Sequence, residues 1–95
     1  MQIDFTGRVA VVTGAASGMG AATARAFRAA GARVLLVDRN AALLETVALE
    51  LDAGLETVAV MVGDVSQSAF CDAVIAQAVT RFGRVDAVEI GRAHV

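Results

Sequence analysis

A chain of 95 residues, 57% of them hydrophobic, has room for one small packed domain and is too apolar for a disordered segment. Its net charge of -2 and its pI near 5.1 argue against a nucleic-acid partner, which requires a basic surface. No apolar run approaches the ~18 residues of a membrane span, no secretory signal opens the chain, and the one cysteine excludes an internal disulfide, so we expect a cytoplasmic protein.

Strand and helix patterns alternate along the chain. Apolar runs typical of buried parallel strands occur four times, at 9–12, 33–37, 57–62 and 85–88. Helical patterns fill the gaps at about 18–30, 41–51 and 67–82. Asn40 and Ser66 are expected to cap the second and third helices, and Gly31 and Gly83 to end the first and third. This β-α-β-α-β-α-β order predicts an α/β fold, the first half of a doubly wound parallel sheet.

Each predicted helix has an apolar face that should pack on the sheet. The faces contain these residues: Ala22, Ala26 and Phe27 in the first helix, Leu44, Val47, Ala48 and Leu51 in the second, and Phe70, Val74, Ala78 and Phe82 in the third.

Between the first strand and the first helix stands Thr13-Gly14-Ala15-Ala16-Ser17-Gly18-Met19-Gly20. A strand followed by a tight turn and a helix N-terminus directs unpaired N–H groups and a positive dipole end at one point, which suits a pyrophosphate. Gly14 allows the turn, Gly18 allows close approach of an anion, and Gly20 allows the helix to pack near the sheet. The spacing fits T-G-x-x-x-G-x-G and not G-x-G-x-x-G, whose third glycine would fall at Thr23.

With this motif the chain resembles the short-chain dehydrogenase/reductase family. Three further landmarks follow in the family's order: Val37-Asp38-Arg39, Gly63-Asp64-Val65, and Phe82-Gly83-Arg84-Val85-Asp86-Ala87-Val88. The resemblance covers Phe5 to about Val88 and implies that residues 1–88 form a partial Rossmann-type NAD(P)-binding domain. The candidate cofactor-binding residues are Gly14, Ser17, Gly18, Met19, Gly20, Asp38, Arg39, Asp64 and Val65.

Asp38 predicts NAD as the cofactor. A carboxylate at the end of the second strand can accept hydrogen bonds from both ribose hydroxyls of the adenosine and would repel a 2′-phosphate. The family comparison agrees, because its NADP-preferring members tend to carry a base where this chain has Ser17, or a neutral residue in place of Asp38. Arg39 argues in the other direction, since its guanidinium could bind the 2′-phosphate of NADP. The alternative is that Arg39 is simply a solvated charge.

Three other residues near the site have two interpretations each. The resemblance assigns Asp64 and the Val65 N–H to the adenine ring, whereas Asp64 could simply favour the dipole of the following helix. The Thr13 hydroxyl is either a tie from the turn to the neighbouring strand or merely exposed. Met19 either fills a gap under the cofactor loop, which is the interpretation we favour, or makes a specific contact.

The end of the chain departs from the family pattern. Glu89-Ile90-Gly91-Arg92-Ala93-His94-Val95 stands where the family has an N-A-G segment, and Ile90 to Val95 matches the translation of a common sequencing adapter. We therefore expect residues 89–95 to be a non-native tail. The family's catalytic Ser and Tyr-x-x-x-Lys are absent, for the chain has no tyrosine and its eight cationic residues are all arginine. We thus expect no catalytic residue and no metal ligand in this chain.

Three functions remain open at this point. The resemblance implies part of an NAD-dependent oxidoreductase that, at full length, exchanges a hydride with a small alcohol or carbonyl compound as a homo-oligomer. The second is a nucleotide-binding module that works by binding alone. The third is the front of a methyltransferase that holds S-adenosylmethionine, which the Thr13-Gly14 start and the wide gap to Gly18 disfavour.

Overall fold

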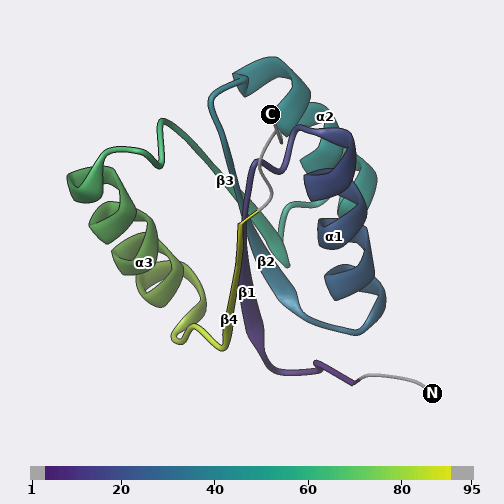
Figure 1. Ribbon diagram of the computed structural model, residues 1–95. Coiled ribbons are helices and arrows are strands. Elements are labelled where there is room, and N and C mark those ends of the chain that lie inside the picture. The colour runs from purple at the N-terminus through teal and green to yellow at the C-terminus, as the bar shows by residue number, and fades with distance from the viewer. Residues whose placement is uncertain (1–3, 91–95) are drawn as a thin grey trace.

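Four parallel strands form one sheet in the computed structural model, which describes residues 4–90 (Figure 1). The strands are β1 (Val9–Thr13), β2 (Arg33–Asp38), β3 (Val58–Val62) and β4 (Ala87–Ile90). The helices between them are α1 (Gly18–Ala29), α2 (Ala41–Leu51) and α3 (Ser68–Phe82). The strand order is β3-β2-β1-β4, so the predicted half of a doubly wound sheet is confirmed.

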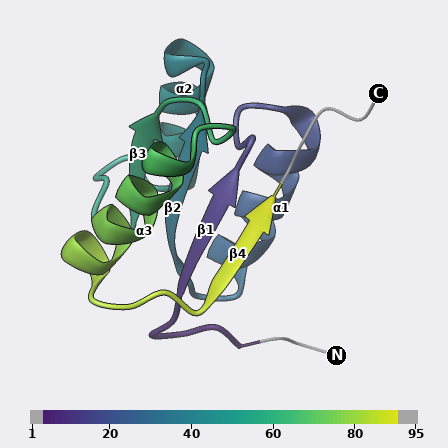
Figure 2. The ribbon, with the colours of Figure 1, turned by 60° about the vertical axis from the view of Figure 1, so that its left-hand side comes forward.

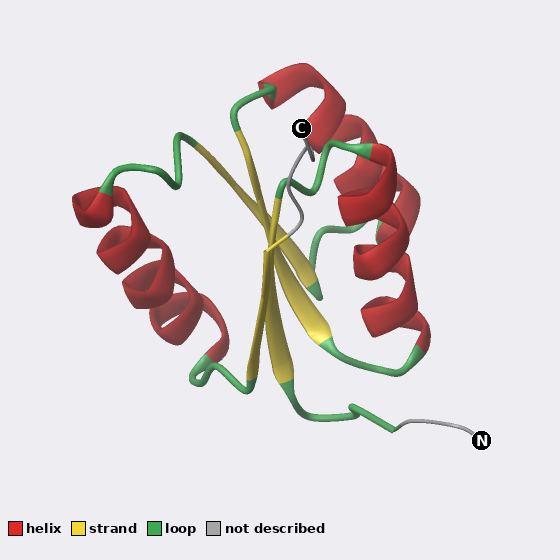
Figure 3. Cartoon of the chain, viewed as in Figure 1, coloured by secondary structure: helices red, strands yellow, loops and turns green. Residues whose placement is uncertain are grey.

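The helices cover both faces of the sheet. Helices α1 and α2 lie on one face and α3 on the other, as the edge-on view shows (Figure 3). Each face has its own core: Leu36 and Leu44 belong to the α1–α2 side, whereas Leu35 and Val74 belong to the α3 side. Strand β1 is buried along its whole length because β2 and β4 flank it and helices cover both faces of the sheet (Figure 2).

The predicted faces of α2 and α3 are confirmed. Leu44, Val47 and Ala48 of α2 are buried, and so are Val74, Ala78 and Phe82 of α3. Leu51 and Phe70 are partly buried and pack against the same two cores.

The predicted face of α1 is wrong at two positions. Ala22 and Ala26 are exposed, and the helix buries Gly20, Ala21 and Ala24 instead, with Phe27 partly buried. Alanine occurs on every side of this helix, so an apolar pattern cannot indicate which side faces the sheet.

Two element boundaries also differ from the prediction. Helix α3 begins at Ser68 with Gln67 at its N-cap, because Ser66 closes a turn with Asp64. Strand β4 begins at Ala87 and extends through Glu89 and Ile90, two residues of the expected tail. The remaining tail residues, 91–95, lie outside the described residues.

Candidate functional site

The carboxyl ends of β1, β2 and β3 meet at one edge of the sheet (Figure 2). A pocket of about 110 Å³ opens there, at the top of the strands. Its lining comes from all three strand ends: Gly14, Val37, Asp38, Arg39, Gly63, Asp64 and Val65. The fold therefore brings five of the predicted cofactor residues, with the neighbouring Val37 and Gly63, into one place, although they lie far apart in the sequence.

The loop after β1 is closed by hydrogen bonds of its own. Gly14 has a φ of 65°, a left-handed conformation that favours glycine. The Ser17 hydroxyl donates to the Gly14 carbonyl at 2.7 Å and accepts from the Gly20 N–H at 3.1 Å. Ser17 is thus the N-cap of α1, so its hydroxyl serves the loop itself.

The first turn of α1 leaves two backbone donors unused. Among residues 4–90, the N–H groups of Gly18 and Met19 have no hydrogen-bond acceptor. A Cβ at Gly18 would meet nothing within 4 Å, so the space beside the donors is open. An anion can approach these N–H groups closely, and the positive end of the helix dipole favours it there.

Met19 does not fill a gap under the loop. Its side chain is 71% exposed, so that interpretation is wrong. What Met19 offers the candidate site is its backbone N–H, which has no acceptor among the described residues.

Gly20 is required by its contact with the loop. A Cβ at this position would lie 2.0 Å from the Gly14 carbonyl oxygen and 2.6 Å from the carbonyl carbon. Both atoms belong to backbone that cannot rotate away. The close approach that we expected between helix and sheet therefore occurs between the helix and the turn that follows β1.

Asp38 is fixed at both carboxylate oxygens. Oδ2 accepts from the Ala16 N–H of the glycine loop at 2.9 Å, and Oδ1 accepts from the Asn40 N–H at 3.0 Å. The carbonyl oxygen of Asp38 also accepts from the Gly63 N–H at 3.0 Å. Because each carboxylate oxygen has two lone pairs, one acceptor position remains on each.

Asp64 and Val65 form the far side of the pocket. Asp64 Oδ1 accepts from the Ser66 N–H at 2.9 Å, and the bonds from Ser66, followed by the positive charge of Arg39, hold the pKa of Asp64 below its ordinary value. The Val65 N–H has no acceptor within the described residues. The pair therefore presents a negative charge and a backbone donor side by side.

Arg39 lines the pocket with an exposed side chain and makes no ion pair within the described part of the chain. Thr13 is buried, and its hydroxyl donates to the Glu89 carbonyl oxygen at 3.4 Å. The predicted tie between the turn and a neighbouring strand is thus present, and the strand is β4.

Sequence reasoning missed two residues that hold the sheet together, one at the carboxyl ends of the strands and one at the opposite end. Ala16 supplies the N–H that binds Asp38, and nothing in an alanine side chain indicates this. Asp86, at the other end of the sheet, has a backbone partner in β1 that lies 77 residues away in the sequence. A contact between a side chain and a distant backbone group leaves no local pattern.

The described residues offer neither a metal site nor a membrane-spanning helix. No group of three or more His, Cys, Asp or Glu side chains in residues 4–90 is placed to hold a metal ion. Within the same residues, no helix is both long and apolar enough to cross a membrane.

Comparison with known proteins gives consistent matches. Residues 8–91 match the family model described as short chain dehydrogenase. The chain is 46% identical over 86 residues to 1,6-dihydroxycyclohexa-2,4-diene-1-carboxylate dehydrogenase of Pseudomonas putida. The alignment covers 90% of this chain and 31% of that enzyme.

Solved structures agree with this match. A short-chain dehydrogenase/reductase of Brucella melitensis, described as a glucose/ribitol dehydrogenase, superimposes with a TM-score of 0.87 at 34% identity, covering 93% of this chain and 37% of the other. L-Sorbose reductase of Gluconobacter frateurii, complexed with NADPH and L-sorbose, gives a TM-score of 0.86 at 32% identity, covering 100% and 36%. The chain thus spans about a third of the length of these proteins.

Proposed function

The chain belongs to the short-chain dehydrogenase family, and from this premise we propose that it is the dinucleotide-binding part of an oxidoreductase that uses NAD. The methyltransferase alternative has no support, since the family model and the relatives named above are dehydrogenases or reductases.

The carboxylate of Asp38 is the observation that carries the proposal. It lines the pocket, and a backbone N–H already occupies one acceptor position on each of its oxygens. The two positions that remain match the two hydroxyls of an adenosine ribose. A carboxylate held in this way needs no rearrangement to bind a ribose, which lowers the cost of binding.

The glycine loop fits the pyrophosphate. The N–H groups of Gly18 and Met19 are donors without acceptors in the described chain, and the space above Gly18 is open. Two phosphates carry negative charge that the N-terminus of α1 attracts. Ser17 holds the loop closed through Gly14 and Gly20.

The adenine ring is assigned to Asp64 and Val65. The Asp64 carboxylate can accept from an exocyclic amino group, and the Val65 N–H can donate to a ring nitrogen. Hydrogen bonds from Ser66 keep this carboxylate ionised and oriented.

The cofactor would supply hydride transfer at its nicotinamide ring. The described residues hold the adenosine and pyrophosphate side, and the Tyr and Lys that move the proton in the family are absent from this sequence. We therefore propose that this chain binds the cofactor and that the reaction of an alcohol or carbonyl substrate needs the further residues that its longer relatives possess. We also propose that the oxidoreductase of which this chain is a part assembles as a homo-oligomer.

NADP is the second candidate. L-Sorbose reductase, a similar structure, is complexed with NADPH, and Arg39 lines the same pocket in this chain. A guanidinium beside the ribose can bind a 2′-phosphate in a bidentate manner. Against this, the Asp38 carboxylate occupies the position where a 2′-phosphate would bring like charge.

Calorimetric titration of the 95-residue chain with NAD and with NADP tests the proposal. We expect NAD to bind about tenfold more tightly than NADP, and Asp38→Ala to lose most of the affinity for NAD. Arg39→Ala should leave NAD binding unchanged and serves as the control for a change at the same pocket. Tighter binding of NADP that depends on Arg39 would overturn the choice of NAD, and no binding of either would overturn the function.

A further inference from the structure

We infer that Asp38 is also a positioning residue for the glycine loop, so that its loss weakens phosphate binding even where no ribose hydroxyl is present. The inference rests on the proposed function, because it concerns the same cofactor site. It separates two effects of one carboxylate: recognition of the ribose and support of the donors that face the phosphates.

The loop is tied to β2 by two hydrogen bonds of different kinds. The Ala15 N–H donates to the Val37 carbonyl at 3.0 Å, a backbone bond that any residue at position 37 would provide. The Ala16 N–H donates to Asp38 Oδ2 at 2.9 Å, and only the side chain can provide this acceptor. The other bonds of the turn, between Ser17 and Gly14 and between Gly20 and Ser17, lie within the turn itself.

Asp38 can hold the loop because it is itself held. Its Oδ1 accepts from Asn40 and its carbonyl from Gly63, so both its side chain and its backbone are fixed. The residue thereby joins the three segments that line the pocket: the glycine loop, the end of β2 and the end of β3. A charged acceptor also makes a stronger bond to an N–H than a neutral one.

The tie at Ala16 lies next to the phosphate donors in the sequence. Gly18 and Met19 follow within three residues, and the direction of their N–H groups depends on the backbone conformation of the turn at residue 16. Without the carboxylate, the Ala16 N–H has no acceptor and the turn keeps only the Ala15 bond to β2. The donors of Gly18 and Met19 would then be less well preorganised for an anion.

Two nucleotides distinguish the two effects. ADP has the adenine, the ribose hydroxyls and both phosphates, whereas 2′,3′-dideoxy-ADP lacks only the hydroxyls. We would titrate both into the full 95-residue chain, into Asp38→Ala and into Asp52→Ala. Asp52 makes a similar set of bonds to backbone N–H groups, at Gly54 and Thr57, beyond the amino end of β3, so its variant controls for a general loss of stability.

We expect Asp38→Ala to weaken the binding of 2′,3′-dideoxy-ADP by about tenfold. Asp52→Ala should leave the affinity for this nucleotide unchanged. If Asp38→Ala weakens the binding of ADP but not of the dideoxy nucleotide, Asp38 contributes only by binding the ribose hydroxyls. The inference then fails and the proposed function survives. If wild type binds neither nucleotide, the proposed function fails.

Amide hydrogen exchange tests the tie without any ligand. The Ala16 N–H should exchange about tenfold faster in Asp38→Ala than in wild type, because it loses its acceptor. Unchanged protection of Ala16 would overturn the inference. Asp38→Asn, which keeps the size of the side chain, is the second variant if Asp38→Ala does not fold. One amide oxygen cannot replace two carboxylate oxygens, so protection retained at both Ala16 and Asn40 in this variant would equally overturn it.

Discussion

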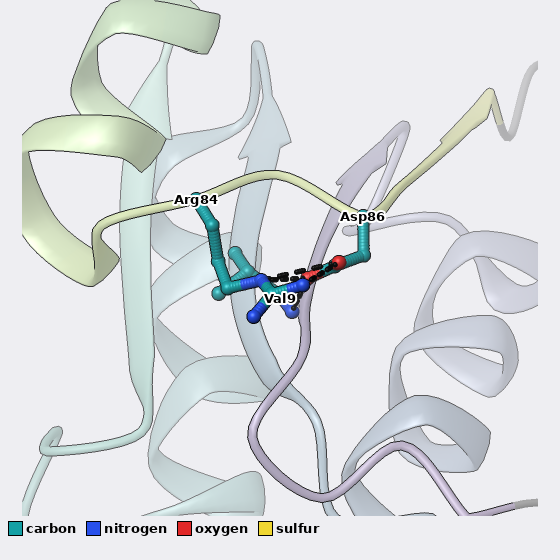
Figure 4. A network of polar contacts seen from close by, with 3 residues as sticks. All are labelled: Val9, Arg84 and Asp86. Carbon is teal, nitrogen blue, oxygen red and sulfur yellow. Dashed lines mark hydrogen bonds and ion pairs between the residues drawn. The ribbon is translucent and has the colours of Figure 1, made fainter.

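Asp86 and Val9 exchange two hydrogen bonds in opposite directions. The Val9 N–H donates to Asp86 Oδ2, and the Asp86 N–H donates to the Val9 carbonyl, each at 2.8 Å (Figure 4). Arg84 binds the same carboxylate through Nε and Nη2, the closest contact being 2.7 Å. The bonds from Arg84 and then from Val9 hold the pKa of Asp86 below its ordinary value. This contact joins the start of β1 to the residue before β4.

Removal of the Asp86 side chain should destabilise the fold. Val9 is buried, so its N–H would lose the acceptor that it has in the fold. We expect Asp86→Ala to lower the Tm by about 5 °C, the size of shift that one lost buried bond gives in a small domain. Thermal unfolding followed by circular dichroism measures it.

Arg84→Ala is the matched control for Asp86→Ala. The Arg84 side chain is 57% exposed, and exposed ion pairs contribute little to stability. Its effect on Tm should therefore be smaller than that of Asp86→Ala. Equal shifts in the two variants would show that the ion pair, and not the bond to Val9, holds the strands together.

Alanine at Gly18 and alanine at Gly20 should have different effects. A Cβ at Gly18 meets open space, so alanine fits at this position without a clash. The same methyl group would stand where an anion must approach the N–H groups, so Gly18→Ala should keep the fold and lose most of the nucleotide affinity. Titration with NAD and a thermal melt measure the two effects.

At Gly20 the new methyl group would clash with backbone. The Cβ would lie 2.0 Å from the Gly14 carbonyl oxygen, so the turn or the helix must move. Gly20→Ala should therefore lower stability by about 2 kcal/mol, in the range of overpacked sites, as well as nucleotide affinity. A Gly20→Ala chain that melts like wild type would show that the loop has more freedom than this contact allows.

The positions of the strands and two of the three helix faces could be predicted because their signals are local. Val9 to Val12 form a continuous apolar run, and the apolar residues of α2 and α3 recur with helical spacing. The face of α1 could not be predicted in this way. Its orientation is set by the contact between Gly20 and the Gly14 carbonyl, and a glycine contact leaves no hydrophobic pattern.

The candidate site was likewise predictable only where its signals are local. The glycine spacing and the position of Asp38 after an apolar strand indicated the pocket and its lining. The sequence did not indicate that Asp38 binds Ala16 or that Ser17 closes its own loop, because these bonds depend on backbone N–H groups that every residue except proline possesses.

Acid should remove the contribution of Asp52 to stability. The Thr57 hydroxyl, with the N–H groups of Thr57 and Gly54, lowers the pKa of Asp52 from its ordinary 3.8 to about 2. A carboxyl with a lowered pKa in the folded state stabilises the fold above its unfolded-state value and loses this effect as the pH falls through the folded-state value. The contribution should therefore be complete above pH 3.8 and decline toward pH 2.

Melts of wild type and Asp52→Asn between pH 7 and pH 2 check this expectation. The Tm difference between the two chains should be constant at neutral pH and shrink toward zero near pH 2. Asp72→Asn, which removes an exposed carboxylate with no hydrogen bond among the described residues, controls for the loss of charge. A difference for Asp52→Asn that persists unchanged at pH 2 would contradict the assignment.

An apolar groove beside β4 should make the isolated 95-residue chain self-associate. The groove has a volume of about 220 Å³ and is lined mainly by apolar side chains, among which Ile75, Val88 and Ile90 are 41%, 50% and 63% exposed. Strand β4 also has only β1 beside it among the described strands, and an open apolar edge favours association.

Sedimentation velocity over a range of concentrations measures this self-association. Ile75→Lys places a charge in the groove and should shift the chain toward the monomer. Leu43→Lys changes an equally large side chain that is 51% exposed on α2, away from the groove, and should have no such effect. A monomer at all concentrations, or the same response to both substitutions, would show that the groove does not drive association.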